Sequence, residues 1–582
     1  MTSEDGLCLC ILKLKHDIKD ESEIKLAKLE AEGLLRRTIK EVKNLVDLLV
    51  KKPLSLFVEE DGVRFQDYFT RLPFLGRVQA FFSEFDNMID PSQLVRRLAY
   101  FKEVYLVFYG EPSEVFEKVE ILKPYKRELK PYASGPRVEL FDLSPFAQLF
   151  SIKGDNTHVL RLICFSYILE SAYYVAKLFG SKSLKEGIER LFKYLKWGVR
   201  RNPVLGGKNE LEDYVDSHTV GKSAEAKYLT HGIHPYKGKF FARMARALLN
   251  YFGLQSGNVV LDPFCGSGTT LLEACLLGID AVGVDINPFS CLISKAKVNA
   301  IKLNPKDIET AAKRFETFVL NEQSSGQTSI LDAFLHNDTR TSIYNQAEVE
   351  NVVKIVFSAA MERSGVRRPK DLKKAFKKEV NELVSQIKVF QTLQKILSLP
   401  ALGEVRVIEG DTRYLSQVLN GEKFDAVITS PPYITKVDYV EEHLKSMLKL
   451  KVTDKQYAER VRELTIGLER KNVPRERCPS EFVKYLINAP SKLRTTIEHY
   501  IVDILQCARE IKNVLKKDGK IAIAIGKNHR FENYVIPTAD IVREIFEKCG
   551  YKLLDSIEIS CPGLFVFKRA DWVETILIFS LR

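Results

Sequence analysis

Several patterns that define well-known classes of protein are missing from this sequence. Its ten cysteines include no Cys-x-x-Cys pair and no cysteine–histidine spacing typical of a metal site, so we expect free thiols and no bound metal. No apolar run is long enough to cross a membrane, and the amino terminus carries no signal-peptide pattern. Internal repeats and low-complexity tracts are also missing. These absences favour a cytoplasmic globular protein with no membrane partner.

Two phosphate-binding motifs are missing as well. Without Gly-x-Gly-x-x-Gly a nicotinamide dinucleotide is a less favoured ligand, and without Gly-Lys-Thr an NTPase loop is disfavoured. The chain has 582 residues, which is enough for roughly two to four domains. Its formal net charge of +12 is a moderate basic excess, which suits a polyanionic partner such as nucleic acid.

A buried strand, a glycine-rich turn and the start of a helix follow one another over residues 259–274. Asp262 ends the strand, and Gly266 and Gly268 allow the backbone to turn sharply and approach a ligand closely. The next strand ends in Asp285, about 20 residues after the turn. Because an acid at that spacing suits hydrogen bonds to ribose hydroxyls, the pattern predicts a site for a nucleoside cofactor.

Another buried strand, over residues 424–429, runs directly into Ser430-Pro431-Pro432-Tyr433. The two prolines fix φ and remove hydrogen-bond donors, which gives a rigid turn. Open α/β sheets bind their ligands at the carboxyl ends of their strands. We therefore predict that this turn faces a ligand site.

Together, Asp-Pro-Phe-Cys-Gly-Ser-Gly-Thr at 262–269 and Thr-Ser-Pro-Pro-Tyr at 429–433 resemble the S-adenosylmethionine-dependent amino-methyltransferases of nucleic acids. The Ser-Pro-Pro-Tyr form resembles the cytosine-N4 branch, because the adenine-N6 and guanine-N2 branches more often carry Asp or Asn at the position of Ser430. The resemblance implies an α/β fold with a Rossmann-like class I methyltransferase sheet. It also implies S-adenosylmethionine as cofactor and nucleic acid as substrate.

A His-Pro-Tyr-x-x-Lys-Phe element at 234–240 precedes the glycine turn. In the family a similar element helps to hold the methionine end of the cofactor; the alternative is a loop packed on the sheet, with His234 as a structural residue. An acid at the position of Asp411 commonly accepts the adenine amino group in the family. The resemblance therefore implies these cofactor-binding residues: His234, Tyr236, Lys239, Asp262, Phe264, Gly266, Gly268, Thr269, Asp285, Ile286 and Asp411.

The resemblance assigns methyl transfer to four residues of the proline turn, namely Ser430, Pro431, Pro432 and Tyr433. The Ser430 hydroxyl and the Pro431 carbonyl would accept the hydrogens of the cytosine amine, and Tyr433 would stack on the base. Transfer is expected to be one direct displacement without a covalent adduct, so Cys265 is not expected to be a nucleophile. Asp438 either takes up the released proton or has no catalytic role.

The chain is expected to contain three parts. Residues 1–150 are predicted to form an α/β domain that binds nucleic acid, and residues 151–215 a helical connector. Residues 216–582 are predicted to form the methyltransferase domain, with helical insertions at about 303–400 and 440–498. Insertions of that size between neighbouring strands are usually functional additions.

The strand–helix–strand order within residues 1–150 resembles the N-terminal ferredoxin-like region of archaeal RNA methyltransferases that carry a THUMP domain. An unrelated α/β domain is the alternative. Residues 123–132 interleave basic and aromatic side chains, which suits contact with a phosphate backbone and stacking on bases. The basic run at 373–378 lies in the first insertion. A solvated surface is the alternative for each segment, and it is favoured for 123–132.

Two substrates remain open at this stage. Structured RNA, ribosomal or transfer RNA, is slightly favoured by the N-terminal resemblance and by the basic segments scattered along the chain. A DNA cytosine-N4 methyltransferase of restriction-modification type is the alternative, because the two motifs are closest to those of the DNA enzymes. A third hypothesis, a non-catalytic RNA-binding protein with a methyltransferase fold, is disfavoured by the intact motifs.

Overall fold

The computed structural model divides the chain into two units, residues 1–222 with 393–399 and residues 223–392 with 400–582, and each is described by itself. From residue 228 onwards it describes the chain to residue 582 apart from 318–345, 365–368, 397–398, 435–437, 470–477, 532 and 561–572. Before residue 228 it describes 8–15, 18, 21–36, 40–42, 80–85, 91–109, 131–135, 138–144, 147–152, 157–179, 186–187, 189 and 191.

The second unit is built on a sheet with the strand order β11-β10-β9-β12-β13-β17-β16. Neighbouring strands from β11 to β13 pair in parallel, whereas β17 pairs antiparallel with both β13 and β16. The strands are β9 (Val259–Asp262), β10 (Asp280–Asp285), β11 (Val405–Glu409), β12 (Phe424–Thr429), β13 (Leu515–Gly526), β16 (Tyr551–Ser560) and β17 (Val573–Leu581). A small hairpin, β14 (His529–Phe531) with β15 (Tyr534–Ile536), stands apart from it.

This strand order reverses direction between β9 and β12. From β9 the chain moves outwards to β10 and β11, and then returns to the other side of β9 to form β12. In open α/β sheets the ligand site lies at such a reversal, outside the carboxyl ends of the strands. The order is that of the Rossmann-like class I methyltransferase sheet expected from the sequence.

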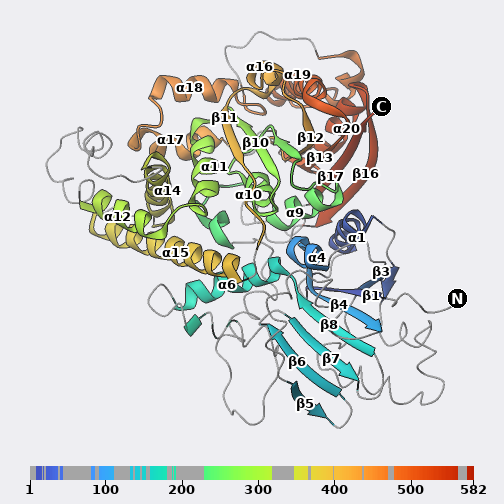
Figure 1. Cartoon of the computed structure of the whole chain (residues 1–582). Helices are drawn as coiled ribbons and strands as arrows, with labels where there is room; N and C mark the ends of the chain where they lie inside the picture. The colour runs from blue at the N-terminus through green and yellow to red at the C-terminus, as the bar shows by residue number, and fades with distance from the viewer. Residues whose placement is uncertain are drawn as a thin grey trace. The chain divides into compact units, whose positions relative to one another are not determined.

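Helices cover both faces of the sheet (Figure 1). One face is covered by α9 (Ala242–Tyr251), α10 (Thr269–Leu276) and α11 (Pro288–Ala300). The other face is covered by α16 (Leu415–Val418), α19 (Ser491–Val514) and α20 (Thr538–Lys548). Because the central strands are buried on both faces, they are nearly continuous runs of Val, Ile, Leu and Ala rather than alternating sequences.

The two expected insertions are helical in the described residues. The first contains α12 (Pro305–Phe315), α14 (Gln346–Ser364) and α15 (Pro369–Ile396). The second contains α17 (Tyr439–Lys449), α18 (Lys455–Leu464) and the 3-10 helix η6 (Ser480–Tyr485). Side chains from α11, α12, α14, α15, α17 and α18 share one apolar cluster, so the two insertions pack on each other and on the sheet unit.

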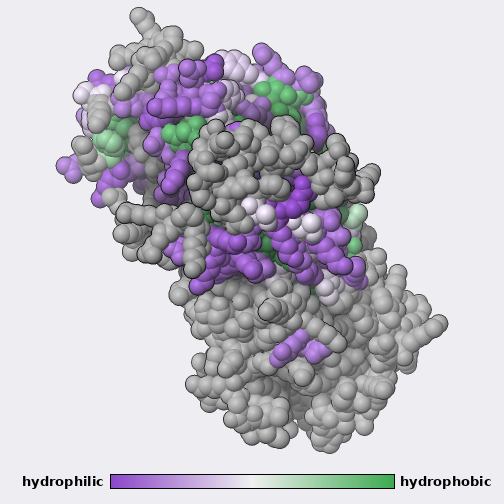
Figure 2. All heavy atoms as spheres, turned by 90° about the vertical axis from the view of Figure 1, so that its left-hand side faces the viewer, coloured by the Kyte–Doolittle hydropathy of each residue, from purple (hydrophilic) through white to green (hydrophobic). Residues whose placement is uncertain are grey.

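The outer surface of these helices is hydrophilic over most of the part coloured in Figure 2. In the basic run of α15, Lys374, Lys377 and Lys378 are exposed, while Phe376 is buried. The run is therefore the polar side of an amphipathic helix. This geometry fits both alternatives for the run, a solvated face and a surface for polyanions.

The first unit contains an antiparallel sheet with the order β2-β3-β1-β4-β8-β7-β6-β5. Its strands are β1 (Cys8–Leu14), β2 (Lys40–Val42), β3 (Ala80–Phe85), β4 (Phe101–Tyr109), β5 (Pro131–Gly135), β6 (Val138–Ser144), β7 (Ala147–Ile152) and β8 (Thr157–Ile163). Its helices are α1 (Glu21–Leu35), α4 (Pro91–Arg97) and α6 (Phe165–Phe179). Among the described residues, the elements from β1 to β4 follow the order β-α-β-β-α-β.

One expectation for this unit is wrong. A helical connector was expected to begin at residue 151, but residues 157–163 form β8, which pairs with β4 and β7 in the N-terminal sheet. The short apolar pattern of Thr157–Ile163 suits either a helix or a strand, and tertiary pairing with β4 and β7 decides the conformation. The basic residues at 123–130 lie outside the described residues. Among the described residues, no helix is both long and apolar enough to span a membrane.

Candidate cofactor and substrate site

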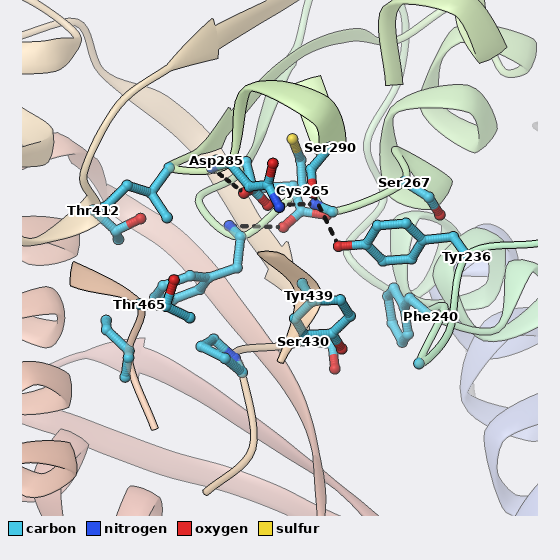
Figure 3. Close-up of a pocket in the computed structure, with 18 of the residues that line it drawn as sticks. Tyr236, Phe240, Cys265, Ser267, Asp285, Ser290, Thr412, Ser430, Tyr439 and Thr465 are labelled. Carbon is cyan, nitrogen blue, oxygen red and sulfur yellow. Dashed lines mark hydrogen bonds between the residues drawn. The ribbon is translucent and has the colours of Figure 1, made fainter. Parts of the chain in front are cut away.

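A pocket lies at the reversal of strand order, at the carboxyl ends of β9, β10, β11 and β12. In Figure 3, Thr412 and Thr465 lie across it from Tyr236 and Phe240. The glycine turn and the proline turn are more than 140 positions apart along the chain, yet residues of both line this one space. The predicted site residues that line it are Tyr236, Lys239, Asp262, Phe264, Gly266, Thr269, Asp285, Ile286, Asp411, Ser430 and Pro432.

The glycine turn needs its glycines for two different reasons. Gly266 and Gly268 have φ values of 48° and 75°, which side chains other than glycine rarely adopt. A Cβ on Gly268 would also lie 2.8 Å from the Ser294 hydroxyl and 2.9 Å from the Ser294 Cβ. Ser294 in turn donates to the Gly266 carbonyl at 2.7 Å. The close approach of α11 to the turn therefore fixes the shape of the loop under the pocket.

Asp285, at the end of β10, is held by two backbone N–H groups. Gly266 donates to one carboxylate oxygen at 2.9 Å, and Asn287 donates to the other at 2.9 Å. Burial raises the pKa of Asp285 to about 6, although these two hydrogen bonds act in the opposite direction. The carboxylate keeps acceptor capacity towards the pocket, as hydrogen bonds to ribose hydroxyls require.

An aromatic wall closes one side of the pocket. Tyr236 stacks on Tyr439 with ring centroids 5.2 Å apart and an interplanar angle of 13°. The Tyr236 hydroxyl pairs with the Ser290 hydroxyl at 3.0 Å. Gly238 is required here, because a Cβ on it would lie 2.7 Å from the Tyr439 hydroxyl. The wall joins the His-Pro-Tyr element to α17 of the second insertion.

Two predicted cofactor residues do not line the pocket: Gly268, within the glycine turn, and His234. The His234 side chain is fully buried, and its Nε2 lies 3.0 Å from the Ser358 hydroxyl. Burial lowers the pKa of His234 to about 4 despite the nearby Glu362 carboxylate, so the ring is neutral at pH 7. Lys239 lines the pocket, and its ammonium donates to the carbonyls of His231 and His234. This geometry corresponds to the structural alternative for His234.

Asp411 caps the short helix that follows β11 and is paired with Arg413. Its carboxylate accepts from the Arg413 Nε at 3.0 Å and from the Arg413 Nη2 at 2.6 Å. Arg413 also pairs with Asp503 of α19 at 2.9 Å. Burial lowers the pKa of Arg413, but the two carboxylates outweigh it and raise that pKa above its ordinary value. The contacts with Arg413 hold Asp411 in one orientation at the edge of the pocket.

The proline turn divides its residues between the pocket and the core. Ser430 and Pro432 line the pocket, while Pro431 is buried. Tyr433 is half-buried, and its hydroxyl donates to Glu574 of β17 at 3.2 Å. Burial raises the pKa of Tyr433 well above its ordinary value, and the neighbouring Glu574 raises it further. The phenol therefore stays protonated and can keep this hydrogen bond.

Two residues considered for chemistry have structural environments. The side chain of Asp438 caps α17 by accepting from the Glu441 N–H at 3.0 Å, and it is paired with Arg462. Cys265 lines the pocket, but burial raises the pKa of its thiol well above the ordinary value. A buried thiol of this kind is not a thiolate nucleophile, in agreement with its expected non-catalytic role.

Sequence analysis missed several pocket residues. Tyr439, Thr465 and Ile466 come from the second insertion, while Ser290 comes from α11 and Thr412 follows Asp411. The one local signal was that Thr412 is adjacent to a predicted site residue. Insertion residues carry no such signal, because only tertiary packing decides which of them face the cofactor pocket.

Comparisons with known proteins place this chain among relatives that are methyltransferases. Residues 234–349 match the family model described as the RMKL-like methyltransferase domain. The type II methyltransferase M.MjaII of Methanocaldococcus jannaschii is 44% identical over 84 residues, which are 14% of each chain. The type II methyltransferase M.BsoBI of Geobacillus stearothermophilus is 25% identical over 303 residues, 44% of this chain and 59% of the relative.

A tRNA (guanine(10)-N2)-dimethyltransferase of Methanothermobacter thermautotrophicus is 44% identical over 52 residues, 9% of this chain and 16% of the relative. The alignments therefore cover less than two thirds of the length of each of these relatives. Methyltransferases of both kinds, type II and tRNA-modifying, are similar to parts of this chain. S-adenosylmethionine is the cofactor that these comparisons support.

The residues present fit that cofactor. Two acids at the ends of adjacent parallel strands, a glycine turn with a left-handed backbone and an aromatic wall surround one pocket. The acids suit ribose hydroxyls and a sulfonium charge, and the aromatic faces suit a cation or an adenine ring.

Proposed function

We propose that this chain is an S-adenosylmethionine-dependent methyltransferase that modifies the exocyclic N4 amine of cytosine in nucleic acid, with structured RNA as the preferred substrate. One observation carries the proposal. Ser430 and Pro432 line the same pocket as Asp262 and Asp285, so the amine-binding turn and the cofactor acids face one space. S-adenosylmethionine supplies an electrophilic methyl group to the amine.

The proline turn activates the amine by orientation. The nitrogen lone pair of a cytosine amine is delocalised into the ring, so the amine is a poor nucleophile. The Ser430 hydroxyl and the Pro431 carbonyl accept its two hydrogens and favour tetrahedral geometry at nitrogen. Because Pro431 is buried and the following Pro432 restricts its ψ, its carbonyl keeps one direction. Positioning of this kind accounts for most of the rate gain in such transfers.

Tyr433 holds the target base in the proposed complex. A base within a duplex or a folded RNA must leave its stack before its amine reaches the turn. Tyr433 stacks on the extruded base, and the hydrogen bond to Glu574 fixes the orientation of the tyrosine ring. The ring therefore loses little conformational freedom when the base binds.

Three features support RNA. The described N-terminal elements have the β-α-β-β-α-β order of a ferredoxin-like domain, which is the arrangement expected from the resemblance to THUMP-type RNA methyltransferases. The net charge of +12 favours a polyanion, and exposed lysines follow one side of α15. A large additional domain suits recognition of folded RNA by shape.

DNA methylation of restriction-modification type is the second candidate. It is favoured by the length of the match to M.BsoBI, which spans 303 residues, against 52 for the tRNA enzyme. If DNA is the substrate, the two helical insertions are the places to seek sequence recognition.

The test is a transfer assay with methyl-labelled S-adenosylmethionine and, separately, total RNA and unmethylated genomic DNA, followed by nucleoside mass spectrometry. We expect label in N4-methylcytidine from RNA. Ser430→Ala should lower the transfer rate by about 100-fold, whereas the control Ser480→Ala, at an exposed serine of η6, should leave it unchanged. Label in N4-methyl-deoxycytidine supports the second candidate, and label on adenine or guanine contradicts the inference from Ser430.

A further inference from the structure

Three potential metal ligands from distant parts of the chain meet behind the aromatic wall. They are His234 before α9, Glu362 of α14 and His443 of α17, and their ligand atoms all lie within 4.8 Å of one another. A Glu362 oxygen lies 3.4 Å from His234 Nε2 and 3.1 Å from His443 Nδ1. The two imidazoles are 0% and 1% exposed. We call these three residues the His–Glu–His cluster.

Two of the three distances in the cluster match those between ligands of one small cation, and the third, between the two imidazole nitrogens, is within 4.8 Å. In a tetrahedral zinc site with ligands at about 2.0–2.2 Å from the metal, neighbouring ligand atoms lie about 3.3–3.5 Å apart. The two contacts of the Glu362 oxygen fall at or just below that spacing. Two imidazoles and one carboxylate are also a donor set that suits zinc and related divalent transition metals. The cluster therefore needs little rearrangement to bind an ion.

Packing holds both rings in position. His443 stacks on Tyr236 with centroids 5.3 Å apart at 21°, and His234 packs edge-on against Phe289 at 5.5 Å. The Glu362 side chain is 22% exposed, which gives an ion a path of entry. The two imidazoles of the site are therefore held by packing, while the Glu362 carboxylate is accessible to an ion.

The geometry points to a divalent transition-metal site, of zinc type, formed by His234 Nε2, His443 Nδ1 and the Glu362 carboxylate. The ion fastens both helical insertions to the turn that precedes the glycine loop. Through the stack of His443 on Tyr236, it also fixes the wall of the cofactor pocket. None of the three ligands lines that pocket, so the ion is structural and its presence does not depend on the proposed methyl transfer.

The test uses the purified full-length chain, stripped with a chelator and titrated with zinc chloride. We expect one zinc ion per chain by elemental analysis and a higher melting temperature on zinc addition. Glu362→Gln and His443→Gln should each weaken zinc binding about tenfold or more. The matched control is Glu379→Gln, which removes a neighbouring insertion carboxylate paired with Arg363 and should bind zinc as the natural sequence does.

Three results would overturn the site. A stripped chain that binds no added zinc, or a Glu362→Gln variant that binds zinc as tightly as the natural sequence, would leave a hydrogen-bonded cluster only. X-ray absorption of the zinc-loaded natural chain showing sulfur at about 2.3 Å would place the metal on cysteines instead. Nitrogen and oxygen ligands at about 2.0–2.2 Å support it, and this measurement does not depend on any variant folding.

Discussion

The Thr429 hydroxyl donates to the Asp262 carboxylate at 2.6 Å, which joins the carboxyl ends of β12 and β9. Both residues are buried, and the same Asp262 oxygen accepts from the Phe264 N–H at 3.2 Å. The residue after Thr429 is Ser430, so one hydrogen bond sets the distance between the cofactor turn and the proline turn. This bond makes a direct experiment possible.

Thr429→Val should remove this bond without changing the size of the side chain. Leaving a buried carboxylate with one partner fewer costs about 1–3 kcal/mol of unfolding free energy. Since the Thr429 bond lowers the pKa of Asp262, that pKa should rise further above about 6, and S-adenosylmethionine should bind more weakly. Calorimetry and thermal melts measure both effects. Thr429→Ser keeps the hydroxyl, and equal binding by the Val variant would show that the bond does not position the site.

Cofactor binding should weaken as pH falls through about 6 rather than about 4. Burial raises the pKa of both Asp262 and Asp285 to about 6, so protonation removes their charge near that pH. Because the folded-state pKa values of the two acids are raised, their contribution to the free energy of unfolding falls as pH rises from about 4 to 6. Ribose binding has the opposite dependence, because it needs the charged form of the acids. Calorimetric titrations from pH 5 to 8 measure the effect.

The control for this pH dependence is Asp285→Asn. Its affinity should be lower than that of the natural sequence at pH 8, and the difference should shrink towards pH 5 as Asp285 becomes neutral in both chains. A constant ratio of affinities over the whole range would contradict a titrating Asp285.

Gly268→Ala should be far more damaging than Gly421→Ala. The two glycines have φ values of 75° and 74°, so the backbone strain is matched. A Cβ on Gly421 meets no atom within 4 Å, whereas one on Gly268 meets the Ser294 side chain at 2.8 Å. We expect Gly421→Ala to cost about 1 kcal/mol and Gly268→Ala about 1–3 kcal/mol more. Chemical denaturation measures the difference, and equal costs would mean that α11 moves aside.

Glu273→Gln should be strongly destabilising, although Glu273 does not line the pocket. The fully buried Glu273 accepts from Arg246 at 2.5 Å, from the Tyr228 hydroxyl at 2.6 Å and lies 2.6 Å from His231 Nε2. Removing the carboxylate charge leaves Arg246 buried without it, at a cost of about 3–5 kcal/mol. Tyr228→Phe removes only one hydrogen bond and should cost about 1 kcal/mol. Denaturation curves of the two variants test this ranking.

The same group predicts resistance to acid. Burial alone would raise the pKa of Glu273, but Arg246, His231 and Tyr228 lower it to about 2. Since the folded-state pKa is depressed, its stabilising contribution is complete above about pH 4.5 and is lost only as pH falls towards 2. Acid unfolding of the natural chain, compared with Glu273→Gln between pH 5 and 2, should show a difference that narrows towards pH 2. A constant difference would exclude this titration.

The strands and helices of the sheet unit were predictable because their signals are local. Val259–Asp262, Phe424–Thr429 and the helix at 538–548 carry continuous apolar or helical patterns bounded by turn residues. The segment 157–163 was not predictable in the same way, since its short pattern suits either a helix or a strand. Pairing with β4 and β7 makes it a strand.

By itself the sequence determined the two chemical turns of this protein. Glycine permits a left-handed backbone and proline fixes φ wherever they occur. The positions of Gly266, Gly268 and the prolines after Ser430 therefore predict the two turns of the site from the sequence. Only the tertiary structure decided which residues complete it: Tyr439 reaches the wall, and His234, Glu362 and His443 meet behind it, through the packing of the two insertions. Contacts between residues so far apart in the sequence depend on the packing of many side chains, and no local sequence pattern predicts them.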